Sequence, residues 1–251
     1  MTKENVLNLT LRSQVLSQND RGWNQWQVVS ETKRVPCAKS AILICDMWDD
    51  HSFRGAAERV EAMAPRMNQV VKAARSLGVR IIHSPSDTMD FYAEHPARRR
   101  MLALPPAPLP VPRPHANPPL PFDARENGSD TNEVVGFRAW TRQHPAIEIT
   151  DDDVISDSGR EVYSFLHHEG ITNLFIMGVH TNMCVLHRTF GIKPMVTWGL
   201  DVALVRDLTD CIYNPAKPPY VSHDEGTALV VGYIEKFWCP SVHSDDLGPA
   251  D

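Results

Sequence analysis

The stretch Leu174–Arg188, which reads LFIMGVHTNMCVLHR, decides the fold expected for this chain. Its first four residues are apolar and partly β-branched, which is typical of a buried strand in a parallel sheet. Gly178 ends that run, and the residues after it have the pattern of a helix, with Thr181 and Asn182 as suitable N-cap residues. The pattern predicts a strand, a turn and a helix, with Cys184 beside the helix N-terminus.

Two interpretations of Cys184 follow from this position. The free N–H groups and the dipole at a helix N-terminus favour a thiolate and offer hydrogen bonds to a developing oxyanion, as a nucleophile requires. A free cysteine is also among the most buried residue types, and most cysteines are inert core residues. Its position alone leaves both interpretations open.

The chain before this stretch contains a strand–helix–strand pattern. Ser40–Cys45 is a second apolar run that ends at Asp46, Ala56–Leu77 has helical spacing, and Val79–His83 is the next strand. A β–α–β unit of this kind predicts a parallel, doubly wound sheet. Ligands of such sheets bind beyond the carboxyl ends of the strands, so we expect Asp46 and the turn before Cys184 to share one crevice.

The remaining segments extend the same pattern. We expect short strands at 146–150 and 153–156, a helix over 157–169, a strand over 201–207 and an apolar C-terminal helix over 226–238. The fold class predicted by this order is α/β, a three-layer α/β/α sandwich with a mostly parallel, doubly wound sheet.

Two segments lie outside that pattern. Alternating residues in the N-terminal extension 1–39 predict a β-hairpin, added either to the main sheet or to a neighbouring subunit. The main domain, 40–251, carries a proline-rich insertion at about 104–122. This insertion is interpreted either as a lid or inter-subunit arm over the crevice, or as a surface loop stiffened by proline.

Composition excludes several classes of protein. With 251 residues, 42% of them hydrophobic, and a net charge of −6, the chain gives no reason to expect nucleic acid or a membrane surface as a partner. No apolar stretch is long enough to span a membrane, and the N-terminus has no signal-peptide core. Five cysteines without CxxC spacing favour free thiols in a reducing compartment. We therefore expect a cytoplasmic protein.

Two motifs resemble those of a known family. Ala41–Asp46 (AILICD) looks like the opening strand of the isochorismatase-like cysteine hydrolases, and Gly178–Val185 (GVHTNMCV) looks like their nucleophile turn. The resemblance runs in order from Ser40 to Trp238. This family includes nicotinamidases, isochorismatases, N-carbamoyl amidases and ureidoacrylate hydrolases. The resemblance implies the parallel sheet sandwich described above, and it implies that the chain forms a homo-oligomer.

The resemblance also implies catalytic roles for individual residues. Asp46 matches the acid/base of the family, and Cys184 matches its nucleophile. The family has a non-proline cis peptide before the nucleophile turn, which here joins Val179 and His180. The backbone N–H groups of His180 and Cys184 would then form an oxyanion hole.

The third catalytic residue of the family, a lysine, has no match here, because the chain has no lysine between Lys72 and Lys193. We predict that Arg142 supplies the positive charge beside Asp46, with Arg138 as the alternative. A guanidinium can hold a carboxylate in one orientation, but it cannot give up its proton.

The same crevice should contain a substrate pocket. We predict that Trp48, His51, Phe53 and Trp140 line it, because ligand pockets typically have aromatic walls with a few polar groups. The substrate is expected to be a small molecule.

No cofactor and no metal are expected. Nicotinamidases of the family hold a metal through an Asp and two His residues. His83, Asp87 and His95 lie in the corresponding part of this chain, and Asp49, Asp50 and His51 lie close to the crevice, but neither group has the spacing of a closed ligand set.

These expectations combine into one predicted function, a cysteine-dependent hydrolase that cleaves a small-molecule amide or carbamoyl C–N bond through a thioester. Two alternatives stay open. One is an isochorismatase-type hydrolase that cleaves a vinyl ether without using the thiol. The other is a non-catalytic member of the family that serves in binding or assembly, which the missing lysine would explain.

Overall fold

An eight-stranded sheet forms the centre of the computed structural model, which describes residues 5–123, 128–133 and 138–248. The strand order is β2-β1-β8-β7-β6-β3-β4-β5. Strands β3 to β8 pair in parallel, whereas β1 is antiparallel to both β2 and β8. The strands are β1 (Val6–Gln18), β2 (Asn24–Pro36), β3 (Ser40–Cys45), β4 (Arg80–Ser84), β5 (Val154–Ile155), β6 (Asn173–Val179), β7 (Asp201–Asp210) and β8 (Ser241–Val242).

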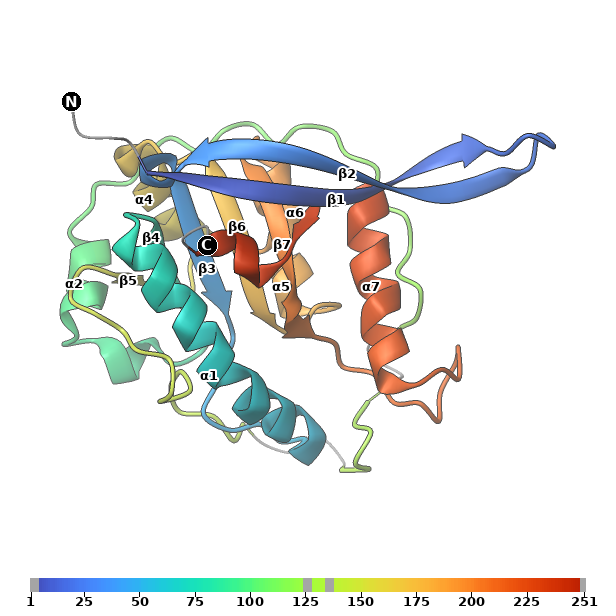
Figure 1. The fold of residues 1–251 in the computed structure, drawn as a ribbon. Coiled ribbons are helices and arrows are strands. Elements are labelled where there is room, and N and C mark those ends of the chain that lie inside the picture. Colours follow the sequence, from blue (N-terminus) through green and yellow to red (C-terminus); the bar gives the residue numbers. More distant parts are fainter. Residues whose placement is uncertain (1–4, 124–127, 134–137, 249–251) are drawn as a thin grey trace.

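Helices cover both faces of this sheet (Figure 1). The long helix α1 packs on one face together with the C-terminal 3-10 helix Ser244–Leu247, and α4 to α7 pack on the other. The helices are α1 (Arg54–Ser76), α2 (Pro96–Leu102), α4 (Gly159–Glu169), α5 (Cys184–His187), α6 (Ile192–Thr197) and α7 (His223–Phe237). The predicted three-layer α/β/α sandwich is thereby confirmed.

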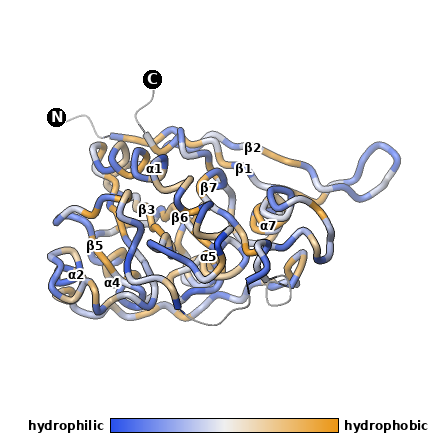
Figure 2. Tube along the Cα trace, turned by 90° about the horizontal axis from the view of Figure 1, so that it is seen from below, coloured by the Kyte–Doolittle hydropathy of each residue, from blue (hydrophilic) through white to orange (hydrophobic). Residues whose placement is uncertain are grey.

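The central strands are apolar because both of their faces are covered. In β3, Ile42 and Ile44 pack on the α1 side, while Leu43 and Cys45 pack on the side of α4 to α7. Successive side chains of a strand point to opposite faces, so a strand between two helical layers needs apolar residues at every position. Figure 2 shows the contrast between the orange stretches at the labels of these strands and the blue distal loop of the β1–β2 hairpin.

Strand β6 differs from the strand expected at this place in the sequence. Gly178 does not end it, because β6 continues to Val179. Gly178 has a φ of +113°, and a Cβ at this position would lie 2.1 Å from the carbonyl oxygen of Cys45. Only glycine lets β6 approach β3 this closely, so Gly178 helps to bring the ends of these two strands together.

Residues 146–150 were also expected to be a strand and are not one; Ile147 is instead buried in the core beside α1. The pattern did not reveal α6 or β8. Both are short and depend on packing against the rest of the molecule for their stability.

The N-terminal hairpin joins the main sheet of its own chain. Its strands are 13 residues long each, and Arg12 of β1 pairs with Ser241 of β8. The buried carboxylate of Glu235, on α7, fixes this junction by accepting hydrogen bonds from Arg12 Nε (2.7 Å), Gln14 Nε2 (2.9 Å) and Ser241 Oγ (2.6 Å). Beyond the junction the hairpin extends past α7 (Figure 1).

None of the helices in the described part of the chain combines the length and the apolar character that crossing a membrane requires.

Candidate active site

The candidate site lies where the direction of the chain through the sheet reverses. From β3 the chain moves outward through β4 to β5, then returns to the other side of β3 as β6. The carboxyl ends of two neighbouring parallel strands diverge at such a reversal and leave a crevice for ligands. Asp46 follows β3 directly, and Cys184 follows β6 after a short turn.

The Asp46 carboxylate is fully buried and held in one orientation. Its Oδ1 accepts a hydrogen bond from the Ser86 N–H at 2.7 Å, and its Oδ2 lies 3.2 Å from Nε of Arg188. The backbone of Asp46 has a φ of 46°, a left-handed conformation that is costly for a residue other than glycine. Strain of this kind is retained where a side chain must be aimed.

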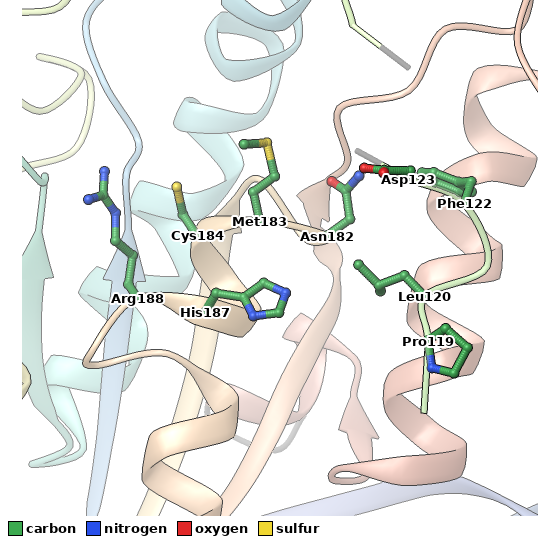
Figure 3. Close-up of a pocket in the computed structure, with 9 residues that line it drawn as sticks. All are labelled: Pro119, Leu120, Phe122, Asp123, Asn182, Met183, Cys184, His187 and Arg188. Carbon is green, nitrogen blue, oxygen red and sulfur yellow. The ribbon is translucent and has the colours of Figure 1, made fainter. Parts of the chain in front are cut away.

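Cys184 lines a cavity of about 690 Å³ together with Arg188 and His187 (Figure 3). The opposite wall comes from the proline-rich segment, through Pro119, Leu120, Phe122 and Asp123. The cavity wall is therefore built in part by the insertion, whose predicted extent reaches residue 122.

The helix that begins at Cys184 is weaker than expected. Helix α5 has four residues, and its N-cap, Met183, makes no side-chain capping bond. The side chains of the two residues expected to cap this helix make other hydrogen bonds. Thr181 Oγ1 pairs with Thr209 Oγ1, and the Asn182 side chain bonds to the backbone of Ile212. A single turn provides little dipole to stabilise a thiolate.

The charge state of Cys184 follows from its surroundings. Burial and the negative charge of Asp46 raise the pKa of Cys184 to about 12, although the nearby Arg188 charge opposes them. Burial likewise raises the pKa of Asp46, and the Arg188 charge lowers it. A thiol with this pKa keeps its proton at neutral pH, so burial outweighs the preference for a thiolate that a helix N-terminus would give. A nucleophilic attack by this thiol would require the loss of its proton, and the adjacent Asp46 carboxylate could accept that proton.

Cys184 is expected to react first among the five thiols with iodoacetamide, because the other four are buried. The reaction should be slow at pH 7 and should accelerate about tenfold per pH unit through pH 10, since only the thiolate is alkylated. Peptide mapping after limited labelling across this pH range measures both effects. Preferential labelling of Cys37 or Cys211, or a rate that levels off below pH 8, would contradict this assignment.

The turn between β6 and α5 leaves two N–H groups available. The peptide bond between Val179 and His180 is cis, as the resemblance implies. The N–H groups of Met183 and Val185 both donate to the carbonyl of His180, at 2.9 and 3.2 Å. Within the described residues, the backbone N–H groups of His180 and Cys184 have no acceptor, so both remain free to bind an oxyanion.

The cation beside Asp46 is Arg188, and the prediction of Arg142 needs correction. Arg142 Nε lies 3.8 Å from Asp49, and its guanidinium stacks over Phe91. The alternative, Arg138, is wrong as well, because its Nε donates to the carbonyl of Trp140.

Arg188 connects three groups of the site. Besides Asp46, it contacts Asp87 Oδ2 at 3.2 Å, and its charge acts on the Cys184 thiol. Arg188 lies four residues after Cys184, a spacing that places two side chains on the same side of a helical turn. That spacing was the available signal, but the family lysine is expected earlier in the chain, and this expectation directed the prediction to Arg142 and Arg138.

Replacing Arg188 with Met is expected to lower kcat/KM by about 10–100-fold and to move the acid limb of its pH profile upward by about 1 unit or more. The sign follows because the positive charge lowers the pKa of Asp46; without it the carboxylate is protonated at a higher pH and cannot accept the thiol proton. Arg188→Lys should recover part of the loss. Arg142→Met is the matched control, and an equal loss in that variant would show that the assignment to Arg188 is mistaken.

The four aromatic residues predicted for the pocket form a cluster of their own. Trp140 stacks on Trp48 with ring centroids 4.3 Å apart and on His51 at 5.6 Å, and Phe53 lies 5.2 Å from His51. None of them lines the cavity that Cys184 faces. The cluster does touch the nucleophile turn, because the His51 and His180 rings lie 5.0 Å apart.

Both histidines of this contact are neutral near pH 7. Burial lowers the pKa of His51 to about 4 and that of His180 to about 3. His180 Nε2 and Trp140 Nε1 are buried and have no hydrogen-bond partner among the described residues. Two unpartnered polar atoms therefore lie in or beside the turn between β6 and α5.

Three of the candidate metal ligands, His83, His95 and Asp87, make hydrogen bonds or ion pairs with other groups. His83 is fully buried and bonds to Gln143 Oε1 (3.0 Å) and Asp153 Oδ2 (3.2 Å), while His95 Nδ1 accepts the N–H of Ala97 as the N-cap of α2. Asp87 pairs with Arg188. The described ranges contain no group of three or more His, Cys, Asp or Glu side chains arranged to hold a metal ion.

Comparison with known proteins identifies the family. The model of the Isochorismatase domain matches residues 40–210, more than half of the chain, so the chain belongs to the isochorismatase family. Its fold is that of an isochorismatase-family hydrolase.

Two solved structures show the same fold. A cysteine hydrolase from Pseudomonas syringae pv. phaseolicola 1448A superposes with a TM-score of 0.52 at 17% identity, covering 85% of this chain and 92% of the other. An isochorismatase from Pseudomonas putida KT2440 gives 0.52 at 11% identity, covering 84% and 91%. No curated protein sequence matches this chain.

Proposed function

We propose that this protein is a cysteine-dependent hydrolase that cleaves an amide or carbamoyl C–N bond of a small molecule through a thioester. The observation that carries the proposal is the placement of a buried carboxylate, Asp46, against a protonated thiol, Cys184, at the wall of a cavity. A carboxylate in that position can take the proton that the thiol must lose before it attacks.

In the first half of the reaction, Sγ of Cys184 forms a bond to the substrate carbonyl carbon while the thiol proton passes to Asp46. The carbonyl oxygen becomes an oxyanion, which the N–H groups of His180 and Cys184 stabilise. Asp46 then gives its proton to the substrate nitrogen, the C–N bond breaks, and ammonia or an amine leaves. A thioester on Cys184 remains.

In the second half, a water molecule attacks the thioester carbonyl and gives a proton to Asp46. The C–S bond breaks, the acid product leaves, and the proton returns to the Cys184 sulfur. Asp46 therefore acts as base and acid in each half. Arg188 takes no part in these proton transfers, because a guanidinium keeps its proton and its charge. It keeps Asp46 ionised and oriented.

Arg188 favours this function over the non-catalytic alternative. The missing lysine was the feature that supported a protein used only for binding or assembly. The Arg188 guanidinium, 3.2 Å from Asp46, supplies the positive charge that the lysine would have provided, although it comes from a different position in the sequence.

The test is a screen of small amides, N-carbamoyl compounds and cyclic imides, with ammonia or amine release as the readout. We expect turnover of at least one class and trapping of the acyl group by hydroxylamine, which intercepts a thioester. A screen without turnover at high enzyme concentration would overturn the proposal. Turnover of a vinyl ether that persists in Cys184→Ala would instead support the vinyl-ether alternative.

A further inference from the structure

A second cavity, of about 500 Å³, adjoins the catalytic one. His187 lines both cavities, and so does the proline-rich segment, which borders the second cavity with Pro112–Asn117 and the first with 119–123. Helix α6 and Trp238 form the other side of the second cavity. We call it the cationic groove, and we define it by Arg113, His115, His187, Lys193 and Trp238.

The charged side chains that line this groove are all basic. Arg113 and Lys193 line it, and none of its lining residues is acidic. Neither cation forms an ion pair within the described residues; Lys193 Nζ donates to Asn117 Oδ1 at 2.7 Å and lies 4.9 Å from the centre of the Trp238 ring. Burial lowers the pKa of His187, and the positive charge of the nearby Lys193 lowers it further. In a chain of net charge −6, such a concentration of unpaired cations points to an anionic ligand.

The walls of the groove are fixed by specific contacts. The N–H of Arg113 donates to the carbonyl of Thr197 at 2.8 Å, and the His115 ring stacks on Trp238 with centroids 4.2 Å apart. Gly199 has a φ of +88°, and a Cβ there would lie 2.7 Å from Arg113 Nη2, so the guanidinium packs directly on this backbone. These contacts hold residues 112–117 of the insertion against α6 and Trp238.

We propose that the cationic groove binds an anionic group of the substrate, so that the substrate is an amide or carbamoyl compound with a carboxylate or phosphate. This inference rests on the proposed function. His187 is three residues from Cys184 on α5, about 4.5 Å along the helix axis. The anionic group of the substrate therefore lies several bonds from the scissile carbonyl. The portion of the substrate between these two groups packs against the apolar wall made by Leu120 and Phe122.

The first experiment tests the groove without using the thiol. Inorganic phosphate is titrated into the protein by calorimetry, and we expect binding that weakens about tenfold in Lys193→Gln and in Arg113→Gln. Lys217→Gln is the matched control, since Lys217 lies outside the groove and is exposed. Absent binding, or equal binding in all four proteins, would overturn the proposal.

The second experiment asks whether the anion belongs to the substrate. Cys184 is inactivated with N-bromoacetyl-γ-aminobutyrate and with its methyl ester, which lacks the negative charge and carries one additional methyl group. We expect the acid to give a KI about tenfold lower than the ester in the wild type and an equal KI in Lys193→Gln, while iodoacetamide reacts equally with both proteins.

The outcomes separate the two proposals. Phosphate binding without a preference for the anionic probe would mean that the groove takes a separate anion, which overturns the assignment to the substrate. A Cys184 that no probe modifies, together with phosphate binding that depends on Lys193, would overturn the proposed function and leave the groove as an anion site without a role in substrate binding.

Discussion

Replacing Cys184 with Ala is expected to lower kcat/KM for an amide substrate by about 10⁴-fold or more. The thioester route needs a covalent nucleophile, and no other described thiol faces the cavity. Loss of a nucleophile removes the whole route, so the residual rate comes only from binding and from the oxyanion hole. The measurement is amine release under single-turnover conditions, which does not depend on product dissociation.

The matched control is Cys239→Ala, a buried thiol just before β8 that does not line the cavity. Its activity should stay near that of the wild type even if its Tm falls. Activity in Cys184→Ala within about tenfold of the wild type would contradict a covalent mechanism. In that event Asp46 would act alone, as the vinyl-ether alternative requires.

Replacing Asp46 with Asn is expected to have two opposite effects on Cys184. Hydrolysis should fall by about 10³-fold or more, because the thiol loses its proton acceptor and the leaving amine loses its acid. Alkylation by iodoacetamide at pH 8 should become faster. The sign follows from the charge: the negative Asp46 raises the pKa of Cys184, so its removal lowers that pKa and increases the thiolate fraction.

Asp87→Asn is the control for this variant, because Asp87 also pairs with Arg188 but is about half exposed, with a side-chain exposure of 51%. It should change neither rate by more than a few-fold. The two effects come from one protein, so misfolding cannot imitate them: an unfolded variant would lose hydrolysis, but it would also expose all five thiols to labelling. Alkylation that slows in a folded Asp46→Asn protein would show that the carboxylate promotes thiolate formation at rest.

Most of the sheet and two residues of the candidate site could be predicted from the sequence. Apolar runs such as Ser40–Cys45 are long enough to mark buried strands, and the order of strands and helices restricts how they can connect. Asp46 was found because it directly follows a strand whose end must lie at the crevice. Cys184 was found for the same reason, at the turn after β6.

The cation and the cavity wall could not be found in this way. Arg188 meets Asp46 across 142 residues of sequence, and a side-chain contact over such a separation depends on packing that local patterns do not encode. The proline-rich segment has no periodic pattern, so its path beside α5 and α6 had no signal in the sequence. The aromatic residues near Asp46 were expected at the cavity because of their type, but type does not determine which side of a loop a ring occupies.

The two edge strands of the sheet differ in length, and this difference limits how a second molecule could extend the sheet. One end is β5, with two residues, and the other is β2, with 13. A foreign strand needs a row of free backbone groups, and β2 offers one along its outer edge. Residues 13–18 of β1 offer a second row, because Arg12 is the one residue of β1 that pairs with β8. Two molecules that joined β2 to β2 about a two-fold axis would cover the first of these edges in both copies and leave the two-residue strand β5 at each end of the joined sheet.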